Sequence, residues 1–150
     1  MDLERALDIL SIQEVLTNYC HAIDFREFDK LDDVFTPDAH IDYTQVGGAK
    51  GDRETIKAWL AEALAKFGAF SHIASNPQIS FDGDTASSRT ILFNPMPVPQ
   101  DGAAPHVFFC GGWYVDDWVR TDAGWRIKKR VEQAGYFHNL PASMTGEAKP

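Results

Sequence analysis

The fold is decided by the stretch from His106 to Phe137, which reads HVFFCGGWYVDDWVR, then TDAG, then WRIKKRVEQAGYF. Both long runs are rich in β-branched and aromatic residues, and the turn-forming residues 121–124 between them predict a hairpin. Strands of this length suit a strongly curved sheet, and the adjacent Gly111 and Gly112 are the expected position of a bend or bulge. The stretch therefore predicts two long antiparallel strands in a curved sheet.

The strand-like character continues upstream of this stretch. Asp82 and Gly83 separate the runs 79–81 and 86–93 and predict a tight hairpin between them. The next segment, 94–102, contains several prolines, which lack the backbone donor that a ladder needs. We therefore expect that this segment is not a central strand.

The first half of the chain has helical periodicity instead. Ser11 and Glu14 have the spacing of a capping box, and apolar residues then recur at three- and four-residue steps as far as Ile23, where the helix should end. Three further elements are expected before the sheet: a short helix over 28–35 stopped by Thr36-Pro37-Asp38, a strand over 39–43, and a helix capped by Asp52 with its stop at Gly68. Helices followed by a curved, mostly antiparallel sheet predict an α+β domain, a cone whose helices cover one face of the sheet.

Composition narrows the function classes. The 150 residues fit a single domain over 1–150, with 141–150 as a mobile tail or lid, and the net charge of −8 argues against nucleic acid as a partner. No apolar stretch approaches the ~20 residues that cross a bilayer, so no membrane span is expected. Cys20 and Cys110 have no metal-ligand spacing and nothing resembles a signal peptide, which predicts a cytoplasmic protein without a metal or other cofactor.

Asp24 and His72 are the most informative pair of polar residues. A carboxylate at a helix C-terminus meets the negative end of the helix dipole and needs a cationic or donating partner. His72 lies in a short apolar run and can be that partner, which would make a proton-transfer site. The alternative is that Asp24 merely ends its helix and His72 is a satisfied core histidine.

Four segments together resemble a known family: Tyr19 with Asp24, Phe-Thr-Pro-Asp-Ala at 35–39, Phe-Ser-His at 70–72, and Gly-Trp-Arg-Ile at 124–127. This pattern resembles the SnoaL-like branch of the NTF2-like superfamily, over nearly the whole chain. Within that branch it is most similar to the scytalone dehydratase, bile-acid dehydratase and hexachlorocyclohexane dehydrochlorinase group. The resemblance implies that His72 acts as the base and that Asp24 orients it.

The resemblance also implies roles for two tyrosines. Tyr19 would hold the substrate or polarise the leaving group, although it equally fits the buried stripe of its helix. Tyr43 matches a second tyrosine of scytalone dehydratase, although it equally fits a cross-strand aromatic pair. Strand alternation allows Arg130 to face the concave side, where it would stabilise an oxyanion; the alternatives are an ion pair with Glu132 or an exposed edge.

The remaining expected substrate contacts are two aromatic residues of the pocket wall and two polar residues in the region of a second histidine of scytalone dehydratase. They are Phe70, Phe108, Asn94 and His106. The spacing of His106 does not match that of the related enzyme, which puts the scytalone substrate itself in doubt.

Together these features predict a cofactor-free lyase, a dehydratase that removes water or a similar group from a small cyclic, largely apolar substrate. An isomerase that uses the same proton abstraction is the near alternative, and a non-catalytic NTF2-like binding or assembly module is the more distant one. The outer face of the sheet, with Trp113 or Trp118, is expected to be covered in a homo-oligomer, a trimer rather than a dimer by resemblance.

Overall fold

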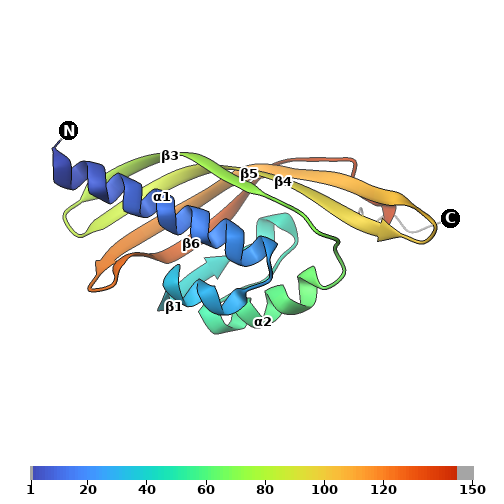
Figure 1. Cartoon of the computed structure of the whole chain (residues 1–150), viewed down its shortest axis with the longest axis horizontal. Helices are drawn as coiled ribbons and strands as arrows, with labels where there is room; N and C mark the ends of the chain where they lie inside the picture. Colours follow the sequence, from blue (N-terminus) through green and yellow to red (C-terminus); the bar gives the residue numbers. More distant parts are fainter. Residues whose placement is uncertain (1, 145–150) are drawn as a thin grey trace.

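The computed structural model describes residues 2–144 and places helices on one face of a six-stranded sheet (Figure 1). The elements are α1 (Leu3–Asp24), η1 (Phe28–Asp33), β1 (Phe35–Asp42), η2 (Thr44–Val46), β2 (Lys50–Gly51), α2 (Arg53–Leu64), β3 (Ile73–Asp82), β4 (Thr85–Gln100), β5 (Ala103–Thr121), β6 (Gly124–His138) and η3 (Ala142–Met144). The strand order is β2-β1-β6-β5-β4-β3, in which β1 and β6 are parallel and the other neighbours antiparallel. The sheet is not closed, and the predicted α+β cone is confirmed.

Helix α1 begins earlier than its sequence pattern indicated. The carboxylate of Asp2 accepts a hydrogen bond from the backbone N–H of Arg5 at 2.8 Å, which caps the helix well before Ser11. The first turns leave Leu3 and Leu7 exposed, so no buried stripe marks this start in the sequence. The stripe predicted beyond Ser11 is buried as expected: Ile12, Val15, Leu16, Tyr19 and Ile23.

The segment between the two α-helices differs from its prediction. The short helix is a 3-10 helix that ends at Asp33, and β1 starts at Phe35 rather than at Ala39. Pro37 therefore lies inside a strand instead of stopping a helix. The pairing of β1 with β6 shifts register between Phe35 and His40, and this irregularity accommodates a residue that cannot donate to the ladder.

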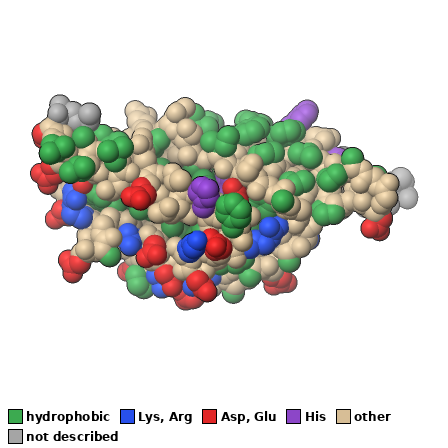
Figure 2. Space-filling view, viewed as in Figure 1, with side chains coloured by type: hydrophobic (Ala, Val, Ile, Leu, Met, Phe, Trp, Pro, Cys, Tyr) green, Lys and Arg blue, Asp and Glu red, His purple; other side chains and the backbone are tan. Residues whose placement is uncertain are grey.

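Helix α2 has the predicted cap. The carboxylate of Asp52 accepts a hydrogen bond from the backbone N–H of Thr55 at 2.8 Å, and the helix ends at Leu64, before Gly68. Its buried side chains, Ile56, Leu60 and Leu64, place α2 against β1 and η1. Charged side chains of both signs lie on the surface of the molecule in the view of Figure 2. Nζ of Lys57 on α2 lies 3.0 Å from Oδ1 of Asp32 in η1.

Strand β4 includes the proline-rich segment. The position of this segment at an edge of the sheet explains why a strand can contain these prolines. Strand β3 begins at Ile73, which pairs with Phe93 of β4. Beyond Phe93, β4 has β5 as its one neighbour among the described strands. The prolines therefore lie in an edge, as their missing donors require, and the prediction that this segment is not a central strand is confirmed.

The two long strands bend at the predicted glycines. The pairing of β5 with β6 shifts register between Gly111 and Gly112. A Cβ atom on Gly112 would lie 2.1 Å from the carbonyl oxygen of Gln133, so only glycine permits this close approach. The prediction that Trp118 lies on the outer face is wrong: it is buried, and its indole N–H donates to the hydroxyl of Ser88 at 2.9 Å, because inward-facing positions alternate along β5.

Candidate active site

Asp24 and His72 are in direct contact. Asp24 is the last residue of α1, and His72 immediately precedes β3, at the end of the segment that crosses from α2 to the sheet. Oδ1 of Asp24 lies 2.6 Å from Nδ1 of His72, and the backbone N–H of His72 also donates to Oδ2 of Asp24 at 3.2 Å. These contacts fix the imidazole ring and assign Nδ1 as its donor, which leaves Nε2 as the atom able to accept a proton.

The surroundings of His72 favour its protonated form. Burial lowers the pKa of His72, but the hydrogen bonds with Asp24 and Cys20 outweigh burial and raise the pKa to about 9. Nε2 is buried and has no hydrogen-bond partner among the described residues. The raised pKa favours a proton on Nε2, and no described residue accepts a hydrogen bond from that nitrogen.

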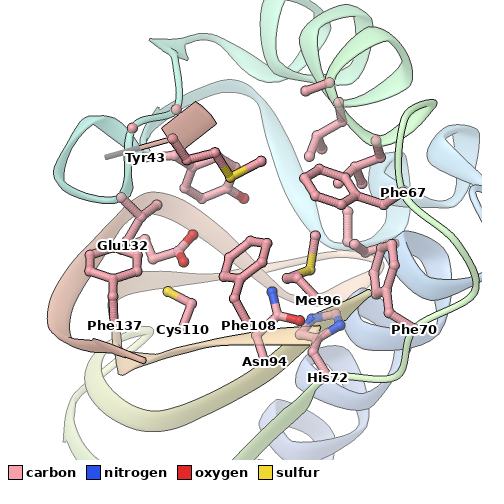
Figure 3. A pocket seen from close by; sticks show the side chains of 18 of the residues that line it. Tyr43, Phe67, Phe70, His72, Asn94, Met96, Phe108, Cys110, Glu132 and Phe137 are labelled. Atoms are coloured by element: carbon pink, nitrogen blue, oxygen red, sulfur yellow. The ribbon is translucent and has the colours of Figure 1, made fainter. Parts of the chain in front are cut away.

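His72 lines a cavity of about 510 Å³ between α2, the end of α1 and the sheet. Figure 3 shows aromatic and sulfur-containing side chains around most of this space. The apolar lining includes Trp59, Phe67, Phe70, Met96, Phe108 and Phe137. A cavity of this size with few polar groups suits a small, largely apolar ligand.

Met144, in the predicted tail, and Leu140, just before it, also line the cavity. The rest of that predicted tail lies outside the described residues.

Two tyrosine hydroxyls form a pair at the cavity. The hydroxyls of Tyr19 and Tyr43 lie 2.9 Å apart, and the Tyr19 ring is edge-on to the ring of His72 with centroids 5.8 Å apart. Burial raises the pKa of Tyr19 to about 12, so its phenol keeps its proton and can donate a hydrogen bond. Tyr19 and Asp24 are about 140° apart on an ideal helix, yet both contact His72 because its segment packs against the end of α1.

Arg130 does not line the cavity. Its side chain is fully buried and donates two hydrogen bonds of 2.7 Å to the two carboxylate oxygens of Asp116. Its guanidinium carbon lies 4.3 Å from the ring centre of Tyr19 and 4.1 Å from that of Tyr114. Arg130 therefore supports the tyrosines from behind, and the predicted direct contact with an oxyanion is replaced by an ion pair with a neighbouring strand.

The structure separates the other sequence-predicted contacts. Tyr43, Phe70, Asn94 and Phe108 line the cavity, and Oδ1 of Asn94 is buried without a hydrogen-bond partner among the described residues. His106 does not line it: this ring lies farther along the β4–β5 hairpin, where its Nε2 is 2.7 Å from the carbonyl oxygen of Asn139. No group of three His, Cys, Asp or Glu side chains within residues 2–144 is arranged to hold a metal ion.

Glu132 is the polar cavity residue that the sequence interpretation missed. It is 8% exposed and lines the cavity beside Cys110. Burial raises its pKa to about 7, although the charges of Arg130 and His72 act in the opposite direction. The signal was present in the sequence, because the alternation that turns Arg130 inward on β6 also turns Glu132 inward.

Comparisons with known proteins agree with this fold. The model of the SnoaL-like domain matches residues 4–131. Rv2910c, an uncharacterized protein of Mycobacterium tuberculosis, is 53% identical over 125 residues, which cover 83% of this chain and 84% of the relative.

Two solved structures share the architecture at low sequence identity. A candidate scytalone dehydratase from Novosphingobium aromaticivorans superposes with a TM-score of 0.79 at 19% identity, covering 97% of each chain. The hexachlorocyclohexane dehydrochlorinase LinA-type3 from Novosphingobium barchaimii gives a TM-score of 0.75 at 18% identity, covering 100% of each chain. The family match over most of the sequence, on a cone of helices and curved sheet, shows that this chain belongs to the SnoaL-like domain family of the NTF2-like fold.

Proposed function

We propose that this protein is a cofactor-free lyase that eliminates water or a similar group from a small cyclic, largely apolar substrate. The observation that carries the proposal is the Asp24–His72 contact, which leaves Nε2 of His72 unpartnered at the wall of an apolar cavity. Structural neighbours named as a candidate scytalone dehydratase and a dehydrochlorinase support an enzyme in this fold. An open cavity is also what a catalytic cone needs and what a plugged binding module would lack.

In this mechanism His72 is the general base. Nε2 of neutral His72 removes a proton from a carbon next to a carbonyl group, and the C–H electrons form a double bond as the leaving group departs with its own electron pair. Asp24 holds the ring and stabilises the imidazolium that forms. The raised pKa of His72 makes it a strong base once its proton has been lost.

The tyrosine pair would stabilise the enolate. Because the hydroxyl of Tyr19 is held 2.9 Å from that of Tyr43, one phenol can donate to a substrate carbonyl oxygen while it accepts a hydrogen bond from the other. Such donors, fixed before the reaction, stabilise charge that develops in the transition state. Arg130 contributes its charge from behind the rings and does not touch the substrate in this mechanism.

The test uses 3-hydroxy-1-tetralone, a bicyclic β-hydroxy ketone whose loss of water gives the fluorescent product 1-naphthol. We expect that His72→Ala loses about 10²–10⁴-fold of the wild-type rate, because the base is gone. The matched control is His40→Ala, a histidine on the exposed side of β1, which should retain the wild-type rate. Equal rates for wild type and His72→Ala would exclude His72 as the base.

The same experiment separates the lyase from the isomerase. An isomerase would return the proton to another carbon of an unsaturated ketone and release no leaving group. Cyclohex-3-enone, which can only shift its double bond, is the probe for that activity. If the wild-type protein converts cyclohex-3-enone but does not convert 3-hydroxy-1-tetralone, the result would favour the isomerase.

We also propose that the outer face of the sheet binds further copies of this chain in a homotrimer. Several large apolar side chains that do not line the cavity are exposed on the strands, namely Ile73, Ile91, Phe93, Val107 and Tyr136. Exposed apolar groups of this kind typically mark interfaces. Light scattering should give a mass about three times the 16.8 kDa of the chain, and a monomer mass would contradict the proposal.

A further inference from the structure

Glu132 is a buried carboxylic acid in the lining of the cavity. It lies on β6 and lines the cavity, and no hydrogen bond from residues 2–144 contributes to the pKa of its carboxyl group. Arg130, whose charge acts on Glu132, already gives two hydrogen bonds to Asp116. A buried carboxyl group with so little compensation favours its neutral, proton-bearing form.

Glu132 and His72 belong to the same cavity but lie on different sides of it. Figure 3 shows the Glu132 carboxyl group on one side and the His72 ring on the other, with Phe108 and Asn94 between them in the view. A ligand that fills the cavity would contact both side chains. One group can therefore accept a proton from the ligand while the other donates one.

We propose that Glu132 is the general acid of this cavity and that the group expelled is a hydroxyl rather than a halide. This inference rests on the proposed lyase activity and names its leaving group. Neutral His72 takes the proton from carbon, and the C–H electron pair becomes the new C=C bond. The C–O bond breaks with its electrons on oxygen, and that oxygen receives the proton of Glu132, so water leaves and Glu132 becomes a carboxylate.

The chemistry explains why an acid implies an oxygen leaving group. Hydroxide is a poor leaving group because water is a very weak acid, whose pKa lies far above the physiological range. Protonation of the departing oxygen removes this difficulty. A halide leaves as a stable anion without a proton, and a neutral acid at this position would give it no comparable help.

The two groups also predict an unusual dependence on pH. The reactive state needs His72 neutral and Glu132 protonated, while their pKa values, about 9 and about 7, favour the opposite arrangement. Because each pKa unit is a tenfold preference, roughly one molecule in a hundred carries the reactive arrangement between those values. A plot of rate against pH should be bell-shaped, with its maximum at about pH 8. The two apparent pKa values of this curve describe the coupled pair and not either residue alone.

Other titratable or charged groups also face the pair, among them Cys20, which is hydrogen-bonded to His72. Burial raises the pKa of Cys110 to about 12, as it does that of Tyr19, and both tyrosines Tyr43 and Tyr114 have a pKa well above the ordinary value. These groups keep their protons from pH 6 to 10. The remaining charged neighbours are Arg130 with its partner Asp116, Asp24 at the far ring nitrogen, and Lys66 at the cavity wall.

A titration tests the assignment of Glu132 without any substrate. In protein with ¹³C-labelled glutamate carboxyl groups, the NMR signal absent from Glu132→Gln identifies the residue. We expect a midpoint at about pH 7 that rises in His72→Asn, because the imidazolium charge lowers it. A midpoint at the ordinary value near 4.5 would overturn the proposal whether or not the protein is a lyase.

Two substrates with different leaving groups test the acid itself. Glu132→Gln should slow loss of water from 3-hydroxy-1-tetralone by about 10²–10⁴-fold and loss of acetate from 3-acetoxy-1-tetralone by less than about tenfold, because acetate needs no proton to leave. The fall in rate above pH 9 should disappear in this variant, and Glu132→Asp should recover part of the water-specific loss. Glu14→Gln, on the exposed side of α1, is the matched control.

The outcomes separate this inference from the proposed function. If His72→Ala abolishes both eliminations while Glu132→Gln slows both equally or neither, the lyase stands and the general acid is wrong. If His72→Ala leaves the rates of both eliminations unchanged, the proposed lyase mechanism and the proposed general acid are both wrong. Selective loss of the hydroxy ketone in Glu132→Gln supports both.

Discussion

Two buried acid–base pairs flank Tyr19, and they differ in whether the base lines the cavity and in whether it can release its proton near neutrality. In the closed pair, Arg130 and Asp116, both carboxylate oxygens receive a guanidinium hydrogen bond and neither side chain is exposed. In the open pair, Asp24 and His72, one ring nitrogen is bound, the other has no partner among the described residues, and the side chain of His72 lines the cavity. The closed pair is suited to hold strands β5 and β6 in register, and the open pair is suited to exchange a proton.

The difference follows from the side chains and their positions. A guanidinium keeps its charge throughout the accessible pH range and matches a carboxylate with two parallel bonds, so it fits a permanent interior contact. An imidazole can gain or lose its proton near neutrality, so it fits a site where protons move. Nη1 of Arg130 and Nε2 of His72 both lack a hydrogen-bond partner among the described residues, so the two pairs are distinguished by whether the base can release its proton near neutrality.

Breaking the closed pair should produce the largest effect. Arg130→Met leaves Asp116 buried without its partner, and we expect a loss of about 3–5 kcal/mol of unfolding free energy in urea denaturation. The double variant Arg130→Met with Asp116→Leu should recover most of this loss, because no unpaired charge remains. If the single variant were as stable as wild type, the pair would not be structural.

Breaking the open pair should change a proton affinity instead. Asp24→Asn removes the carboxylate that opposes the burial of His72, so the pKa of His72 should fall from about 9 to below its ordinary 6.5. The ring resonances in ¹H–¹⁵N NMR spectra report this value directly. A midpoint that stays near 9 would show that Asp24 does not set it.

The open pair should also make stability depend on pH. The pKa of His72 is raised on folding, so its contribution to stability is complete below about pH 6.5 and is lost as the pH rises through about 9. Urea denaturation across this range should show a falling unfolding free energy in wild type and a flatter dependence in Asp24→Asn. Equal slopes in the two proteins would contradict the assignment.

The smallest effect concerns the hydroxyl pair between the two ion pairs. Tyr43→Phe removes one partner of a buried hydrogen bond and should cost about 0.5–1.5 kcal/mol of unfolding free energy. Tyr136→Phe, at an exposed tyrosine, is the control and should change stability by less. A cost as large as that of Arg130→Met would mean that Tyr43 belongs to the closed structural unit.

Much of the architecture could be predicted because it depends on patterns of residues that are close together in the sequence. The stripe from Ile12 to Ile23, the cap at Asp52 and the glycine bend at Gly111 each follow from residues close together in the chain. The start of α1 and the proline inside β1 were missed, because an exposed first turn has no buried stripe and a strand irregularity depends on its neighbour.

The sequence by itself determined the α+β cone, the family and the candidates Asp24 and His72, since periodicity and motif spacing survive without coordinates. Only the tertiary structure decided the partners: Arg130 binds Asp116 across a strand pair, and His106 lies off the cavity. Which side chains meet depends on strand register and sheet curvature. Those are set by packing over the whole molecule, so no local pattern records them.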